Sequence, residues 1–190
     1  MAILSIRIVG DPVLRTAAEP VTDFGPDLAK LVADMFETMD DVGGAGLAAP
    51  QVGVGLRVFT YQVDGRRGHV VNPELSTAGE SQEDHIEGCL SVPGIGFPAK
   101  RYMYSRVTGV DLDGTPVDVE GEGMLARCLQ HETDHLNGLL FTDRLDGEDR
   151  RTAMRALRGA GYGSVAQRTT AKRARTVGSA FGAGGSGAGG

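Results

Sequence analysis

Two histidines and a glutamate occur in the spacing His-Glu-x-x-His, as His131, Glu132 and His135. Four residues advance an α-helix by little more than one turn, so both imidazoles project from one face and can bind a single metal ion. Glu132 then lies close enough to act as a general base on the attacking water. This arrangement predicts a hydrolytic site, because a structural metal needs four protein ligands. Chance spacing of histidines is the alternative.

The residues around this motif predict the helix that positions it. Leu125, Cys128, Leu129 and Leu136 recur at steps of three and four residues, and the pair Asn137-Gly138 is a good helix terminus. The motif shares its face with apolar residues, so its polar groups should point inward. A buried carboxylate beside two imidazoles is costly unless a cation pairs with them, which favours metal binding over chance.

The third metal ligand is predicted to be one of the two cysteines. Cys128 lies one turn before His131, but a short side chain on a straight helix cannot reach an ion held by the next two turns. Cys128 is therefore predicted to be a small core residue. Cys89 comes from a distant segment, and with two histidines it would leave a fourth position open, as in catalytic sites. A Cys89–Cys128 disulfide is disfavoured, because nothing in the sequence indicates an oxidising compartment.

A glycine-rich segment over residues 43–53 could meet an extended peptide with its backbone. Gln51, within it, carries an amide that can donate a hydrogen bond to the oxyanion formed when water attacks a carbonyl. Taken alone, the segment is better explained as a helix C-cap followed by a turn.

Together, three segments resemble the motifs of the peptide deformylase family. They are the sequences GAGLAAPQ at 44–51, EGCLS at 87–91 and QHETDHLNG at 130–138, all intact and in the family's order. The resemblance extends from about Ile6 to Leu145. It implies removal of the N-formyl group from the N-terminal formylmethionine of nascent polypeptides, with release of formate. It also implies small antiparallel sheets around a central helix that carries the His-Glu-x-x-His motif.

The resemblance further implies a role for individual residues. The metal ligands would be Cys89, His131 and His135, and the catalytic residues Glu132, Gln51 and the backbone N–H of Leu90. Substrate would be bound by Gly46 through its backbone and by a methionine pocket partly lined by Ala45, Leu125 and Cys128. One cysteine and two histidines suit zinc, iron, cobalt or nickel. The family points to Fe²⁺ in the cell, with zinc, nickel or cobalt in purified protein.

Two alternative functions belong to other classes. A zincin-type metallopeptidase would need a further ligand downstream, for which Glu148 is a candidate, and would leave the EGCLS segment unexplained. A non-catalytic homologue that binds formylated peptides or the ribosome would be expected to lack Glu132, Cys89 or Gln51, and none is missing.

The composition is that of an ordinary globular protein, but the C-terminal region differs from the rest of the chain in charge. Of 190 residues, 41% are hydrophobic and 23% charged, and no run suggests a membrane span or signal peptide, so a cytoplasmic location is expected. Residues 1–143 carry 10 basic and 22 acidic residues, whereas residues 144–190 carry 9 basic and 3 acidic ones. The basic end could contact ribosomal RNA or could simply be a soluble tail, which we favour because its arginines are not interleaved with a series of aromatics.

The predicted elements give an α+β fold with antiparallel sheet. An amphipathic helix begins at Pro26 and stops at Gly43-Gly44, strands cover 56–63 and 69–72, and Asp113-Gly114 marks a hairpin. A basic helix follows the motif helix at 147–158. We expect a catalytic domain over residues 1–158 and a disordered basic, then glycine-rich, tail over 159–190.

Overall fold

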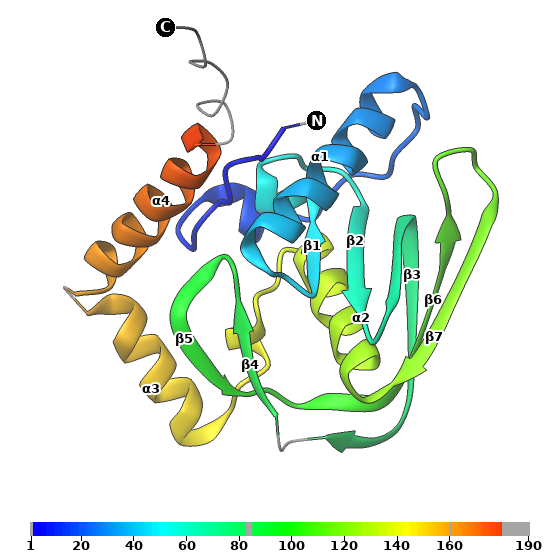
Figure 1. Ribbon diagram of the computed structural model, residues 1–190. Coiled ribbons are helices and arrows are strands. Elements are labelled where there is room, and N and C mark those ends of the chain that lie inside the picture. The colour runs from blue at the N-terminus through cyan, green and yellow to red at the C-terminus, as the bar shows by residue number, and fades with distance from the viewer. Residues whose placement is uncertain (1, 83–84, 160, 180–190) are drawn as a thin grey trace, which may run out of the picture.

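The structure is a computed structural model that describes residues 2–82, 85–159 and 161–179. It combines helices with two antiparallel sheets, which confirms the predicted mixture of helix and antiparallel strand (Figure 1). The helices are α1 (Pro26–Val42), α2 (Gly123–Leu136), α3 (Gly147–Arg158) and α4 (Tyr162–Ser179). The strands are β1 (Gly46–Ala48), β2 (Val58–Val63), β3 (Arg66–Gln82), β4 (Ile86–Cys89), β5 (Val92–Pro98), β6 (Arg101–Val110) and β7 (Pro116–Glu122).

Helix α1 begins and ends where the sequence predicts. Pro26 occupies its first turn, where a missing N–H costs nothing, and Gly43 closes it in the left-handed conformation with φ of 62°. Its apolar stripe, including Leu28, Met35 and Met39, is buried in a core cluster shared with β1 and β2. Helix α1 therefore covers one face of the sheet where β1 and β2 lie.

The larger sheet has the strand order β1-β2-β3-β6-β7, and all its pairings are antiparallel. Asp64 and Gly65, both at positive φ, make the tight turn between β2 and β3. Strand β3 is much longer than the predicted 69–72 because it pairs first with β2 and then with β6. Strand β1 pairs only with β2, so it forms an edge of this sheet.

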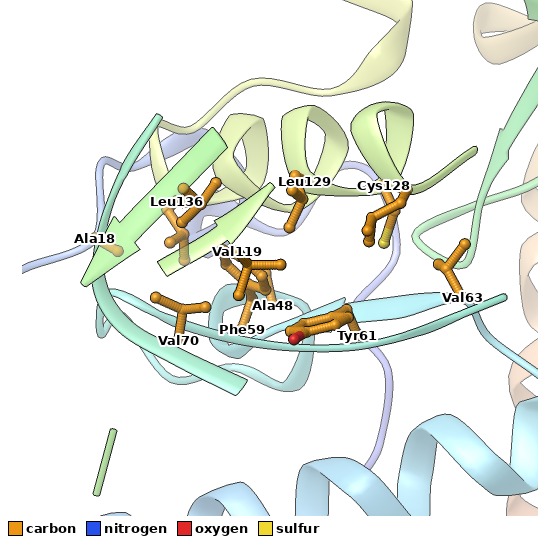
Figure 2. Close-up of a cluster of buried hydrophobic side chains, with 12 residues drawn as sticks. Ala18, Ala48, Phe59, Tyr61, Val63, Val70, Val119, Cys128, Leu129 and Leu136 are labelled. Carbon is orange, nitrogen blue, oxygen red and sulfur yellow. The ribbon is translucent and has the colours of Figure 1, made fainter. Parts of the chain in front are cut away.

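Helix α2 packs against the larger sheet and carries the His-Glu-x-x-His motif. Figure 2 shows its Cys128, Leu129 and Leu136 facing side chains of the sheet, among them Phe59 and Tyr61. Leu129 and Leu136 are fully buried. Because the helix is fixed along its length by this apolar contact, its polar motif residues have a defined position relative to the strands.

The C-terminal region departs from the expected tail. Residues Tyr162–Ser179 form helix α4, which contacts β5, so the predicted disorder is wrong for this segment. Its half-buried positions fall at helical spacing, at Tyr162, Val165, Ala166, Thr169 and Arg173. Only Val165 among them is a large aliphatic residue, and Thr169 and Arg173 are polar. The pattern is therefore too weakly apolar to predict a buried helix face from the sequence. Residues 180–190, most of the predicted glycine-rich tail, lie outside the described residues.

Helix α3 packs on the second sheet and closes a smaller core. Its Ala153 is fully buried with Val92 of β5 and with Leu140, Phe141 and Leu145 from the segment after α2. None of the helices in the described ranges combines the length and hydropathy that crossing a membrane requires.

Candidate metal centre

Three electron-rich side-chain atoms converge between α2 and the end of β4. The Sγ atom of Cys89 lies 3.3 Å from Nε2 of His135, and that nitrogen lies 3.2 Å from Nε2 of His131. Atoms bound to one ion at 2.0–2.3 Å in a tetrahedron stand roughly 3.3–3.8 Å apart. The three residues are the group with metal-binding geometry in the described part of the chain. One thiolate and two imidazoles at these separations fit a single divalent transition metal.

Glu87 orients one of these imidazoles. Its Oε1 lies 2.6 Å from Nδ1 of His131, on the ring side opposite the converging atoms. A carboxylate in this position keeps the proton on Nδ1 and leaves Nε2 free to bind a metal. Burial alone would raise the pKa of Glu87, but hydrogen bonds from Arg101 and His131 hold it well below its ordinary value. Glu87 therefore stays a carboxylate.

A buried guanidinium connects this carboxylate to helix α2. Arg101, 2% exposed, donates to both carboxylate oxygens of Glu87 at 2.6 and 2.9 Å and to Oδ2 of Asp134 at 2.6 Å. Arg127 also donates to Glu87 at 3.0 Å, and Arg144 donates to Asp134 at 2.9 Å. The network ties β4, β6 and α2 together directly behind the candidate ligands.

We expect Arg101→Met to lower the free energy of unfolding by about 3 kcal/mol, because removing one member of a buried ion pair leaves uncompensated charge. Such losses are typically about 3–5 kcal/mol. Arg127 still pairs with Glu87 and Arg144 still pairs with Asp134, so the loss should lie at the lower end of this range. Denaturant unfolding measures it. Arg106→Met is the matched control on the same strand, since its pair with Asp118 is about half exposed, and it should lose less than about 1 kcal/mol. Equal losses would contradict a special role for the buried network.

Glu132 lies beside the three converging atoms without a partner of its own. It is 3% exposed, and its Oε2 is buried with no hydrogen bond in the described structure. Burial raises the pKa of Glu132 to about 7. A Cβ atom on Gly46 of β1 would lie 2.3 Å from Glu132 Oε1, so only glycine leaves room for this carboxylate. The group is thus held at the site in a position suited to exchanging a proton.

Gln51 and Cys128 both border the site, in different ways. The side-chain amide of Gln51 is held by the N–H of Ala48, which donates to Oε1 at 2.8 Å, and its Nε2 points toward Cys89 Sγ at 3.7 Å. Cys128 instead donates to the carbonyl of Ala45 at 3.4 Å. Burial raises the pKa of the Cys128 thiol well above its ordinary value, so it stays protonated.

A cavity of about 410 Å³ opens beside these groups. Of the residues expected to bind substrate, Ala45, Gly46 and Cys128 line it. The expected catalytic residues Gln51, Leu90 and Glu132 and the candidate ligands Cys89 and His131 line it as well. Leu125 does not line it. Its side chain is buried against Gly121 of β7, where a glycine Cβ would come within 2.6 Å of Leu125 Cδ2. The expectation that Leu125 lines a substrate pocket is therefore wrong, because this position faces the sheet.

Sequence reasoning missed two groups of residues at the site. The first is the network of Glu87, Arg101, Arg127 and Asp134; Glu87 and Asp134 stand inside two of the motifs, but their role depends on arginines that carry no local signal. The second is a set of apolar residues at the cavity mouth, where Ile86 and Met124 are exposed. Large exposed apolar side chains at a cavity indicate contact with a ligand.

The chain is similar to known proteins over most of its length. Residues 3–151 match a family model described as polypeptide deformylase. A peptide deformylase of Acidothermus cellulolyticus is 58% identical over 160 residues, covering 84% of this chain and 88% of the relative. A peptide deformylase of Mycolicibacterium paratuberculosis is 52% identical over 180 residues, covering 86% and 91%.

Solved structures agree in fold. The peptide deformylase of Thermus thermophilus matches with a TM-score of 0.78 at 38% identity, covering 90% of this chain and 99% of that one. That of Synechococcus elongatus, solved in complex with actinonin, matches with a TM-score of 0.77 at 36% identity, covering 85% and 88%. The chain belongs to the polypeptide deformylase family.

Proposed function

We propose that Cys89, His131 and His135 hold one divalent metal ion, with which the enzyme removes the formyl group from formylmethionine at the start of nascent polypeptides. The observation that carries this assignment is the convergence of one sulfur and two nitrogen atoms beside the unpartnered carboxylate of Glu132. Nε2 of His135 lies 3.3 Å from the sulfur and 3.2 Å from Nε2 of His131, and all three atoms lie within 4.8 Å of one another. The metal is Fe²⁺ in the cell, with zinc, nickel or cobalt as occupants of purified protein, since this donor set suits all four. Helix α2 is the central element around which both sheets present the other groups.

Glu132 is the general base and then the general acid. When bound, the metal polarises the formyl carbonyl and makes water more acidic. Glu132 takes one proton from the attacking water as the C–O bond forms. It delivers that proton to the peptide nitrogen as the C–N bond breaks, so the products are formate and a free amino terminus. A carboxylate with a pKa near neutrality suits both transfers.

Gln51 and the backbone N–H of Leu90 stabilise the negative charge that develops on the formyl oxygen. Both residues line the cavity, and the Gln51 amide is already oriented by Ala48. Donors that are fixed before the reaction lower the barrier because they need not reorganise during it.

The peptide substrate is bound along the open edge of β1. The N–H of Gln62 donates to the carbonyl of Ala45 at 2.7 Å, and Gly46 is paired with Tyr61. This makes Gly46 and Tyr61 a non-hydrogen-bonded pair, so the backbone groups of Gly46 point away from β2. An extended peptide could add there as a further strand. Ala45 and Cys128 then border the pocket for the methionine side chain.

One pair of assays tests this function. Formate release from a formyl-Met peptide should be observed with metal-loaded enzyme, and internal cleavage of an unformylated peptide should not. Cleavage without formate release would favour the metallopeptidase alternative instead. For that alternative the geometry is poor, since Glu148, its candidate ligand, is an exposed residue of α3 paired with Arg151 at 2.6 Å.

We further propose that the basic face of α3 contacts the ribosome, where nascent substrates emerge, and that the enzyme is accordingly cytoplasmic. The exposed side chains of Arg150, Arg151, Arg155 and Arg158 border one surface depression. Closely spaced guanidinium groups favour phosphate binding. Deleting α3 would remove the buried Ala153 from the small core, so we test this face with substitutions of its exposed arginines.

Arg150→Glu/Arg158→Glu is expected to reduce co-sedimentation with ribosomes, because each lost phosphate contact weakens binding and lowers its salt dependence. Turnover of small formylated peptides should be unchanged. Arg150→Lys/Arg158→Lys, which keeps the charge, is the matched control and should still pellet. Equal pelleting of all variants at two salt concentrations would leave this face without a role in ribosome binding.

A further inference from the structure

Helix α4 lies against the strand that follows the metal ligand Cys89. It contacts β5, and a Cβ atom on Gly94 of that strand would meet the Val165 side chain at 3.1 Å. Figure 1 shows α4 and α3 flanking β5 on the side away from the larger sheet. The family match ends at residue 151, so α4 belongs to the part of the chain outside it. A contact from α4 to the site therefore comes from a segment that the family match does not include.

Arg173 makes that contact. Its Nη1 donates a hydrogen bond to the carbonyl oxygen of Leu90 at 3.1 Å. This carbonyl belongs to the peptide group between Leu90 and Ser91. The N–H of the same peptide group donates to Sγ of Cys89 at 3.3 Å. One planar peptide unit thus joins the guanidinium to the sulfur atom of the candidate metal ligand.

The peptide unit transmits both orientation and charge. A guanidinium at the oxygen fixes the direction in which the N–H points, and it polarises the amide so that the N–H becomes a stronger donor. The neighbouring backbone is held as well, because Ser91 is fully buried and its carbonyl accepts from the N–H of Val9 at 2.8 Å. Hydrogen bonds to a metal-binding sulfur reduce the electron density that it donates.

We propose that Arg173 is a positioning residue for Cys89, acting through the Leu90–Ser91 peptide group, so that α4 tunes the metal centre. The proposal rests on the assignment of Cys89 as a metal ligand. It also predicts that Leu90, whose N–H is assigned to the oxyanion, is held in place by the same arginine. A role in docking α4 alone would leave the electronic state of the sulfur unchanged.

The test uses the full chain loaded with Co²⁺, whose thiolate-to-metal charge-transfer band reports on the sulfur directly. Arg173→Met should shift this band to lower energy. Without the guanidinium, the hydrogen bond from the N–H of Ser91 to Sγ of Cys89 becomes weaker, and this raises the energy of the sulfur lone pairs. Transfer of the metal to excess chelator should become about 10-fold faster, because the loss of a fixed position for Cys89 outweighs its stronger electron donation, as for other positioning partners of metal ligands. Arg173→Gln, whose amide is too short to reach the carbonyl, should behave alike, so the test does not depend on one variant folding.

Arg168→Met is the matched control, because this arginine lies on α4 but is exposed. Its band and its metal transfer rate should equal those of the wild type. The proposal is overturned if the Arg173 variants keep the wild-type band, or if Arg168→Met shifts it equally. A wild-type protein that binds Co²⁺ without a thiolate band would overturn the assignment of Cys89 itself, and is thus distinguished from a failure at Arg173.

Discussion

Glu132→Gln is expected to bind one metal ion per chain and to lose roughly 10²–10⁴-fold in turnover, the usual effect of removing a general base. Glutamine has nearly the same shape as glutamate, so the packing against Gly46 should be retained. It cannot take a proton from water, and that is the function assigned to Glu132. The metal should stay, because the three ligand atoms come from Cys89, His131 and His135.

Metal analysis and formate release on the same preparation check this expectation. Glu122→Gln serves as the control, because Glu122 is an exposed residue at the start of the same helix and makes no side-chain cap bond. It should keep full activity. Near wild-type turnover by metal-loaded Glu132→Gln would show that another group moves the proton.

The local part of the site could be predicted from the sequence because helix geometry fixes it. Once residues 124–136 are helical, His131 and His135 must share a face, whatever surrounds them. The same geometry also explains the error at Leu125. Leu125 lies six positions before His131 and is therefore rotated by about 240° around the helix axis, where the helix faces Gly121 of the sheet. Met124, one position earlier, returns to the face of His131 and lines the cavity.

The groups behind the ligands could not be predicted, because only tertiary structure brings them together. Arg101 begins β6, and nothing in its neighbours indicates that it will be buried between Glu87 and Asp134. Helix α4 was missed for a related reason. Its docking stripe ends in Arg173, a residue type normally found in solvent. Here Arg173 is partly buried and finds its acceptor in a peptide group 83 residues away.

Cys89→Ala is expected to lose metal binding, because two imidazoles one helical turn apart are left without the third ligand. Cys128→Ala should still bind one metal ion per chain. The Cys128 thiol already donates to the Ala45 carbonyl and packs in the core between α2 and the sheet. Removing a buried sulfur there costs packing energy, about 1–3 kcal/mol by analogy with other large-to-small core changes, but removes no ligand.

The pair of variants separates the two cysteines because both replace the same residue type with alanine. Metal content per chain is measured after dialysis, and unfolding free energy is measured in parallel. Cys89→Ala should be nearly metal-free and inactive, while its fold is retained through the ion pairs of Glu87 and Arg101. Cys128→Ala should be metal-loaded and less stable. The reverse pattern of metal content would mean that the helix distorts enough to bring Cys128 to the ion, which the separation of about two turns between Cys128 and His135 makes unfavourable.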